Sequence, residues 1–486
     1  MTKLADSALD LFSRSLVITG GCEFGMVRNG SGNQLAVLSA SSLPEFEGER
    51  GELDGQVLAL CGQSAGNAAA LRTHLPWLKP QPLGLVTSAG MGDRLGLATA
   101  GHVRAARAVG GRIAPIFIQQ SIREMNRTGR TPQQVLDDAT WGMFAEGWQA
   151  PHGADADHLK SFEDIDICLA SGYSFFTIDP GAHVDNRAET EDLSELRELA
   201  SLLPGEVPVE QSGLARKHFQ IENIHIAFDE QTLLQAAVKY GRAIAFVAGM
   251  YHHLEKAAAG RPFEMEVSVD ETEQPTSLAE HVYIASELTR LGVKWVSLAP
   301  RYVGRFEKGV DYIGSLPAFE ADFAGHAAIA RHFGPYKLSL HSGSDKFSIY
   351  PIAARLSQGS VHLKTAGTSY LEALHTIAST EPGFLNEIYQ FARERYETDR
   401  ASYHVSAELD QAPLPEAVSD WNALLEQFDA REILHVTFGS VLTEKTADGK
   451  WRFRDRLMDI LQSNQESYAS NLERHFIRHL TPFLPG

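Results

Sequence analysis

The chain has 486 residues, 43% of them hydrophobic, so it is long and apolar enough to bury a sizeable core. Its 62 acidic residues outnumber 43 basic ones, and the net charge of −19 argues against nucleic acid as a partner, because nucleic-acid-binding proteins carry a basic surface. Three cysteines are too few for a disulfide framework, and no signal sequence or stretch long enough to cross a membrane is recognisable. We therefore expect a cytoplasmic protein that has no membrane partner and that could form a homo-oligomer.

The first predicted region, residues 1–80, is a small α/β segment. Three short apolar runs are typical of strands, "LVITGG", "QLAVLSA" and "QVLALCG", and "SAGNAAALRTHL" is typical of a helix. The proline-rich stretch "KPQPLG", residues 79–84, marks its boundary.

Eight further strands are expected in residues 81–375, most of them separated by helical stretches. They are predicted at 84–90, 114–120, 154–160, 174–180, 264–271, 294–300, 336–342 and 361–367. Eight such units predict an α/β fold, a (β/α)8 barrel of the TIM type, with an open doubly wound sheet as the alternative. No GxGxxG motif follows a strand, so no NAD site is expected.

Two stretches outside this alternation of strands and helices are expected to be helical. The long interval 181–262 must hold additional helices within the barrel region. Residues 376–486 are predicted as a helical C-terminal extension that ends in an amphipathic stretch at about 451–483. His475 and His479 lie four residues apart there, and we expect an exposed pair rather than half a zinc site.

Reactive side chains follow several of the predicted barrel strands, at the ends where barrel enzymes carry their active groups. His158, His341 and His362 occupy such positions, and Glu266 lies on the fifth strand. One histidine alone would more often be structural. Three of them beside a carboxylate suit one divalent ion, Zn²⁺, Mn²⁺, Co²⁺, Ni²⁺ or Fe²⁺, which would act as a Lewis acid.

The fifth strand has an unusual acidic face. Its period of two places Glu264, Glu266, Ser268 and Asp270 on one side. In an antiparallel sheet this side would face water. In a barrel it faces the interior, where carboxylates require a partner or a cation. Elsewhere Gln119 and Arg301 could hold hydroxyls or a carboxylate.

Several long motifs resemble the tagaturonate epimerase family. They are "GDRLG", "FIQQSIREMNRTGRTPQQVLDDATWG", "GADADHLK", "VSVDETEQPTS", "LHSGSDKFSIYP" and "VHLKTAGTSYLEAL". The resemblance implies a TIM barrel, dependence on a divalent metal and interconversion of D-tagaturonate and D-fructuronate in galacturonate catabolism. Some relatives act on fructose and tagatose as 4-epimerases.

The resemblance also implies roles for particular residues. The metal would lie on His158 and His341, with Glu266 or His362 completing its ligands, and acid/base catalysis would fall to Asp157 and to Glu266 or Glu271. Substrate contacts are expected from Gln119, Lys160, Asp270, Arg301, Ser342, Asp345, Lys346, Lys364 and Thr365. The lysines would neutralise the substrate carboxylate in an otherwise acidic protein.

The two ketouronates differ at a carbon β to the ketone, whose C–H bond is not acidified by that carbonyl. A retro-aldol cleavage followed by re-addition would invert this carbon, and migration of the carbonyl through an enediol is the alternative. The competing functions are a neutral ketohexose 4-epimerase, a metal aldolase similar to class II, and a non-catalytic sugar-acid-binding protein. The last is least favoured because none of the expected reactive residues is missing.

Overall fold

The expected barrel is confirmed. In the computed structural model, which describes residues 3–30 and 32–484, eight strands close in the order β10–β13–β14–β15–β16–β7–β8–β9. The strands are β7 Ser88–Gly90, β8 Ala114–Ser121, β9 Gly153–Leu159, β10 Phe175–Ile178, β13 Glu264–Val269, β14 Ser297–Pro300, β15 Lys337–Leu340 and β16 Val361–Lys364. Each overlaps one of the eight predicted ranges. Closure excludes the open doubly wound sheet.

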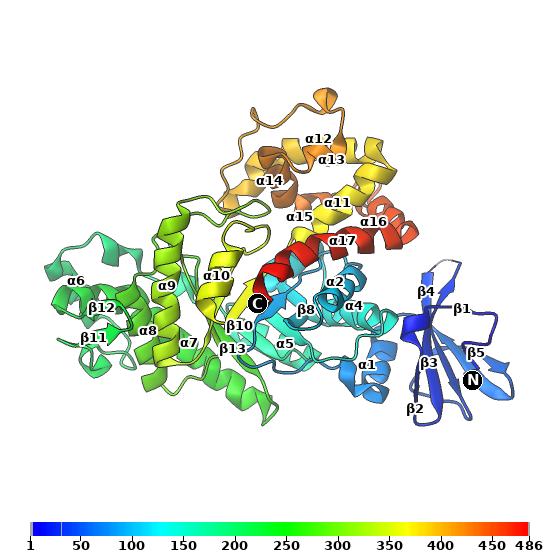
Figure 1. Cartoon of the computed structure of the whole chain (residues 1–486), viewed down its shortest axis with the longest axis horizontal. Coiled ribbons are helices and arrows are strands. Elements are labelled where there is room, and N and C mark those ends of the chain that lie inside the picture. Colours follow the sequence, from blue (N-terminus) through cyan, green and yellow to red (C-terminus); the bar gives the residue numbers. More distant parts are fainter. Residues whose placement is uncertain (1–2, 31, 485–486) are drawn as a thin grey trace. The chain divides into compact units, whose positions relative to one another are not determined.

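Helices connect the barrel strands, and their starts follow local sequence signals (Figure 1). Thr131 and Gln134 form a capping box at the start of α4 Pro132–Ala145, whose first residue is Pro132, and Ser277 with Glu280 does the same for α8 Leu278–Arg290. The helices of this region are α2 Thr99–Ala108, α3 Ile122–Thr128, α4 Pro132–Ala145, α5 Phe162–Ser171, α6 Leu193–Ser201, α7 Glu230–Ala258, α8 Leu278–Arg290, α9 Leu316–Phe333, α10 Tyr350–Ser357 and α11 Thr368–Thr380. The helical content expected between residues 181 and 262 is thus found, mainly in α7.

The N-terminal segment contains an antiparallel sheet followed by helix α1, Ala65–His74. The strands are β1 Asp10–Leu11, β2 Val17–Thr19, β3 Cys22–Asn29, β4 Gly32–Ser39, β5 Gly48–Leu53 and β6 Gln56–Cys61. The three predicted strands correspond to β2, β4 and β6. β5 was not predicted because its sequence, GERGEL, is mostly exposed and has no apolar alternation.

The C-terminal extension is helical, as predicted, but its last part differs from the expectation. The stretch 451–483 contains two helices, α16 Arg454–Ser463 and α17 Gln465–Leu480, which are separated at Asn464. The preceding helices are α12 Pro382–Asp399, α13 Trp421–Leu424, α14 Phe428–Val436 and α15 Phe438–Thr443. The expectation of an exposed histidine pair is wrong: His475 and His479 are buried, because α17 packs against α2 and α11. His475 Nδ1 lies 3.1 Å from Glu372 Oε1.

Tertiary contacts group the chain into two compact units. One comprises Met1–Pro80, Met91–Ala154 and Ala366–Leu480, and the other comprises Gln81–Gly90, Asp155–Thr365 and Thr481–Gly486. Both units are discontinuous in sequence, whereas the predicted division into 1–80, 81–375 and 376–486 is continuous, and that division stays a prediction. The second unit contains β7, β10, β13 to β16 and most of β9, and the candidate site described below lies within it.

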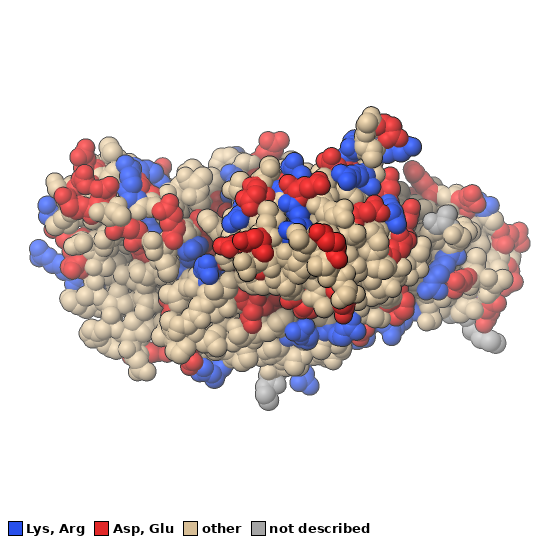
Figure 2. Space-filling view, turned by 90° about the horizontal axis from the view of Figure 1, so that it is seen from above, with Lys and Arg blue, Asp and Glu red and all other residues tan. Residues whose placement is uncertain are grey.

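Two surface properties bear on the partners of the protein. Acidic and basic side chains are interspersed over much of the face drawn in Figure 2. Among the described residues, no helix is both long and apolar enough to cross a membrane.

A buried histidine pair between α8 and α9 makes the fold sensitive to acid. His281 Nδ1 lies 2.8 Å from His326 Nδ1, and His281 Nε2 lies 2.7 Å from the hydroxyl of Tyr336. Only one of the two Nδ1 atoms can carry a proton at this distance, so a second proton would set two N–H groups against each other. Burial, followed by the nearby His326, lowers the pKa of His281 well below 6.5.

We therefore expect the free energy of unfolding to fall as the pH drops below about 6.5. In this range His281 binds a proton in the unfolded chain but stays neutral in the folded chain. The contribution of this one residue approaches about 1.4 kcal/mol per pH unit. Urea unfolding between pH 7 and pH 5 measures it. His281→Gln should flatten the dependence, whereas His252→Gln, at an exposed position, should leave it unchanged. Equal pH dependence in His281→Gln and the unmodified protein would contradict the expectation.

Candidate active site

The lumen of the barrel is polar in the second unit. Residues that pair across neighbouring parallel strands share a face of the sheet, and the pairs Thr177↔Glu266, Glu266↔Ser297 and Ser339↔His362 all belong to the inward face. The functional reading of the acidic fifth strand is thereby supported, because Glu266 is fully buried instead of facing water.

Lys364, at the end of β16, lies at the centre of this polar lumen. Its Nζ atom is 2.8 Å from Asp155 Oδ2, 2.7 Å from Asp157 Oδ1 and 2.8 Å from Glu266 Oε1. It also donates to the hydroxyl of Thr177 at 2.6 Å. Four oxygen atoms therefore surround the ammonium group of Lys364, which was predicted to contact substrate. Lys364 is thus the internal counterion of three buried carboxylates, and its contact with substrate stays a prediction.

The three carboxylates share one cation, Lys364, but their pKa values are shifted in different directions. Burial raises the pKa of Asp155 to about 7 against the opposing effect of Lys364, and the charges of Asp157 and Glu266 raise it further. Burial also opposes ionisation of Asp157, but Lys364 and the two histidines His158 and His341 lower its pKa. Asp155 is thus the member of the cluster that takes up a proton first.

A β-bulge in β9 brings two consecutive residues to the site. The register runs from Ala156↔Phe176 to Leu159↔Ile178, so both Asp157 and His158 stand opposite Thr177 on β10. His158 has φ = +53°, a left-handed conformation that bulges accommodate. Regular alternation would direct Asp157 and His158 to opposite faces. Because of the bulge, His158 Nε2 lies 3.8 Å from Asp157 Oδ1.

His158, Asp270 and His341 form a compact group of possible metal ligands. One nitrogen or oxygen atom from each lies within 4.8 Å of the others. A second carboxylate supports each histidine: His158 Nδ1 lies 3.1 Å from Asp179 Oδ2, and His341 Nε2 lies 2.6 Å from Glu266 Oε1. Metal-binding histidines usually have such an outer carboxylate, which fixes the ring and its tautomer.

The electrostatics of the group also favour a cation. Burial disfavours the charged imidazolium, yet Asp157 and Asp179 raise the pKa of His158 to about 9. Asp270 and Glu266 likewise raise the pKa of His341 to about 10, against burial and the nearby Lys364. Both rings therefore hold an extra proton at neutral pH when no metal competes.

A charge count made above pH 7, where all carboxylates of the site including Asp155 are ionised, is compatible with a divalent ion. Five carboxylates, those of Asp155, Asp157, Asp179, Glu266 and Asp270, face the ammonium groups of Lys364 and Lys160 and leave three negative charges. Protonation of His158 and His341 reduces the excess to one. One dication with two neutral histidines gives the same result, so the donor set and its charge suit such an ion.

The third predicted histidine lies elsewhere in the lumen. His362 Nδ1 is 2.9 Å from the hydroxyl of Ser88, which also accepts a hydrogen bond from the buried Lys337. Burial lowers the pKa of His362 to about 3. The structure thus brings together two of the three histidines and adds Asp270, which was expected to contact substrate. Glu266 lies behind His341.

Other predicted residues lie at the rim or in the loops that follow the strands. Glu271 is 35% exposed, and its Oε2 atom lies 3.7 Å from Lys160 Nζ. Ser342 and Asp345 both have left-handed backbone conformations in the loop after β15. The hydroxyl of Thr365 donates to the carbonyl of Gly90 at 2.7 Å. Gln119 is buried on β8 in the first unit.

Lys346 has a structural task that its sequence position did not reveal. Its buried Nζ atom donates to the backbone carbonyls of Glu307, Val310 and Ser344. These three bonds connect the loop after β14 to the loop after β15 and use all three N–H donors of the ammonium group. The predicted contact of Lys346 with substrate stays a prediction.

The predictions omitted Asp155, Thr177 and Asp179. Asp155 is two residues before Asp157 and shares its inward face, so the alternation in "GADADHLK" could have identified it. Asp179 directly follows β10, the position that was examined for other strands. Thr177 gives no such signal, because a threonine within a strand is ordinary.

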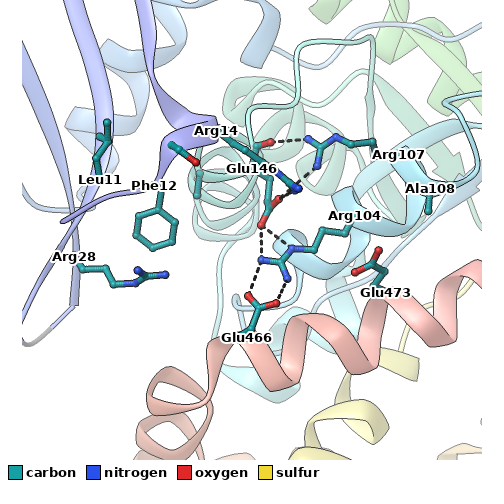
Figure 3. Close-up of a pocket in the computed structure, with 12 residues that line it drawn as sticks. Leu11, Phe12, Arg14, Arg28, Arg104, Arg107, Ala108, Glu146, Glu466 and Glu473 are labelled. Atoms are coloured by element: carbon teal, nitrogen blue, oxygen red, sulfur yellow. Dashed lines mark hydrogen bonds and ion pairs between the residues drawn. The ribbon is translucent and has the colours of Figure 1, made fainter. Parts of the chain in front are cut away.

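A separate cavity of about 610 Å³ lies in the first unit, lined in part by β3, α2 and α17. Figure 3 shows Arg14, Arg104 and Arg107 converging on Glu146, which closes α4. Arg14 Nη1 and the Arg104 guanidinium each lie 2.8 Å from the Glu146 carboxylate. These arginines thus connect the N-terminal segment with α2 and α4.

Fold and site together define the class: a (β/α)8-barrel enzyme with its reactive groups at the carboxyl ends of the strands. The family model described as tagaturonate epimerase matches residues 12–483, so the chain belongs to the tagaturonate epimerase family. The tagaturonate/fructuronate epimerase of Thermotoga maritima is 42% identical over 453 residues, which cover 92% of this chain and 91% of that protein.

Solved structures agree with this assignment. The native crystal structure of fructuronate-tagaturonate epimerase from Cohnella laeviribosi is 39% identical, with a TM-score of 0.93 over 99% of this chain and 98% of that one. A glycerol complex of the same enzyme is 38% identical, with a TM-score of 0.93 over 99% and 97% of the two chains.

Proposed function

We propose that this protein interconverts D-tagaturonate and D-fructuronate in galacturonate catabolism. The observation that carries the proposal is the similarity along 99% of the chain to an enzyme named for this reaction. The lumen agrees with it, because buried carboxylates and histidines open toward solvent through Asp270 and Glu271, which are 21% and 35% exposed. A small hydroxylated substrate can approach the buried carboxylates and histidines from that end.

The proposal includes one divalent ion, Zn²⁺, Mn²⁺, Co²⁺, Ni²⁺ or Fe²⁺, held by His158, Asp270 and His341. The outer carboxylates of Asp179 and Glu266 would orient the two rings. When bound, the ion supplies Lewis acidity that polarises the ketone and stabilises negative charge on oxygen.

We favour the retro-aldol route, in which one group removes the proton from the hydroxyl at the carbon to be inverted. The C–C bond between this carbon and the carbon adjacent to the ketone then breaks, which gives an aldehyde and an enediolate. The aldehyde turns, and the bond forms again on its other face. The same group returns the proton to the new alkoxide. A single proton carrier is therefore sufficient.

Glu271 is our candidate for this proton carrier. It lies at the exposed rim, whereas Glu266 is fully buried between Lys364 and His341. Asp157 remains ionised because Lys364 and the two histidines lower its pKa against the effect of burial, so it is a weak base. In this mechanism Asp157 instead holds Lys364 in place, with His158 beside it.

Incubation of purified, metal-loaded protein with D-tagaturonate in deuterium oxide tests the proposal. We expect a mixture of the two hexuronates without deuterium on the carbon skeleton, and loss of activity on chelation with recovery after a divalent metal is added back. Deuterium between the ketone and the inverted carbon would support the enediol route. Accumulation of three-carbon products would identify an aldolase, and turnover of fructose or tagatose alone would identify a ketohexose epimerase.

A further inference from the structure

Arg301 is a cation without a partner beside the candidate site. It directly follows β14, and its backbone is fixed by two hydrogen bonds with Thr276, of 3.1 Å and 2.8 Å. The side chain is half-buried, and its Nε atom is buried without a hydrogen-bond partner. Within residues 3–30 and 32–484, no group forms a hydrogen bond or an ion pair with this guanidinium. A buried N–H group that lacks a partner is costly, and an anionic ligand would remove that cost.

The lysines predicted to bind substrate are already engaged. Lys364 is surrounded by three carboxylates, and Lys346 by three backbone carbonyls. Lys160 is exposed, but its Nζ atom lies 3.0 Å from Asp179 Oδ2 and 3.7 Å from Glu271 Oε2. Of Arg301 and these three lysines, the described part of the chain leaves only the charge of Arg301 available to a ligand.

The strand register places Arg301 at the level of the candidate metal ligands. Val269 on β13 pairs with Pro300 on β14, so the next residues along, Asp270 and Arg301, are neighbours. On the other side Leu298 of β14 pairs with Leu338 of β15, and Arg301 and His341 each directly follow the last residue of these two neighbouring strands. Neighbouring strands lie roughly 4.8 Å apart. A ligand held at Asp270 and His341 is therefore within reach of the Arg301 guanidinium.

We propose that Arg301 binds the carboxylate of the substrate and makes the site selective for a ketouronate over a neutral ketohexose. The inference rests on the proposed function and deepens it by assigning the group that selects the substrate class. A guanidinium presents two parallel N–H donors that match the two oxygens of a carboxylate. The hydroxymethyl group of a neutral sugar carries no charge and would leave a half-buried cation uncompensated.

Binding of unreactive probes tests the inference without catalysis. Calorimetric titration of the metal-loaded protein with D-gluconate, an anion, and with D-sorbitol, its neutral counterpart, gives the preference for a carboxylate. We expect Arg301→Met to weaken gluconate binding about 10- to 100-fold and to leave sorbitol binding unchanged, with partial recovery in Arg301→Lys. Equal losses for both probes, or an unchanged preference for gluconate, would overturn the proposal.

The matched control is Arg305→Met, on the same loop. Arg305 is 57% exposed and already faces Glu307 at 3.4 Å, so both probes should bind to this variant as they bind to the unmodified protein. Arg301→Met should also keep its melting temperature within about 2 °C, because the substitution removes no hydrogen bond or ion pair that the guanidinium forms with the described residues.

Kinetics separate this inference from the proposed function. We expect kcat/KM for D-tagaturonate to fall about 10- to 100-fold in Arg301→Met, while any turnover of D-tagatose persists. An unmodified protein that converts neither ketouronate would refute the proposed function, and the probe titration would still decide the role of Arg301. A protein that converts ketouronates equally well with methionine at position 301 would refute the role of Arg301 alone.

Discussion

Replacing Lys364 with methionine is expected to lower the free energy of unfolding by about 3–5 kcal/mol and to abolish epimerase activity. The substitution leaves Asp155, Asp157 and Glu266 buried together without the ammonium group that lies within 2.8 Å of all three. Removal of one partner from a buried ionic cluster costs about this much, because the remaining charges cannot regain water. Equilibrium unfolding in urea of the metal-free protein measures the loss.

Two further variants separate charge from packing. Lys364→Met combined with Asp155→Asn should recover part of the lost stability, since one of the three uncompensated carboxylates is then neutral. Lys160→Met, at an ammonium group that is 51% exposed, should cost about 1 kcal/mol or less. A Lys364→Met protein as stable as the unmodified one, or a double variant less stable than Lys364→Met alone, would contradict the assigned role of Lys364.

Uptake of one divalent ion at pH 7 should release about two protons. Because carboxylates raise the pKa of His158 to about 9 and that of His341 to about 10, both rings are protonated at pH 7 in the metal-free protein. A metal requires neutral imidazoles. Affinity should therefore rise about 100-fold per pH unit up to roughly pH 9, about tenfold per unit between about pH 9 and pH 10, and then level off. Calorimetric titrations in two buffers with different ionisation enthalpies count the protons.

The ligand assignment is tested by the same titrations. His341→Ala should lower metal affinity by a factor of about 100 or more and reduce proton release to about one. Asp270→Asn should also weaken binding, whereas His362→Asn should retain it, because His362 lies apart from the compact ligand group. Strong binding to Asp270→Asn together with its loss in His362→Asn would restore the ligand set inferred from sequence.

The raised pKa values of His158 and His341 make stability depend on pH in the opposite direction from His281. The protonated His158 and His341 stabilise the metal-free fold fully below about pH 6.5, and this contribution is lost as the pH rises through 9 and 10. A metal removes the dependence, because it replaces both protons. Metal-free and metal-loaded proteins should therefore differ most in stability at alkaline pH.

Much of the architecture could be predicted from sequence because it rests on local periodicity. The acidic alternation of Glu264, Glu266 and Asp270 was sufficient to predict a polar lumen once eight strands had been counted. His341 was predicted as a metal ligand because it ends its strand, and the structure groups it with His158 and Asp270. These signals depend only on neighbours in the chain.

What could not be predicted depends on partners distant in sequence. Lys346 and Lys364 look alike as lysines after barrel strands, yet one is bonded to carbonyls 36 and 39 residues away and the other to a carboxylate 207 residues away. Likewise, nothing within "LAPRYVG" distinguishes Arg301 from an arginine that already has a partner. Only the folded chain shows which cations are engaged.

The bulge in β9 has a consequence for how this segment can change in evolution. The additional residue opposite Thr177 lets Asp157 and His158 serve the same site and returns Leu159 to the apolar layer, where it is fully buried. Deletion of either residue would leave Leu159 two positions after Ala156 and so still in the apolar layer, but the bulge and one of the two reactive side chains would be lost. A change in length here therefore removes a side chain from the site. Alignments of relatives should therefore show no gap between Asp155 and Lys160.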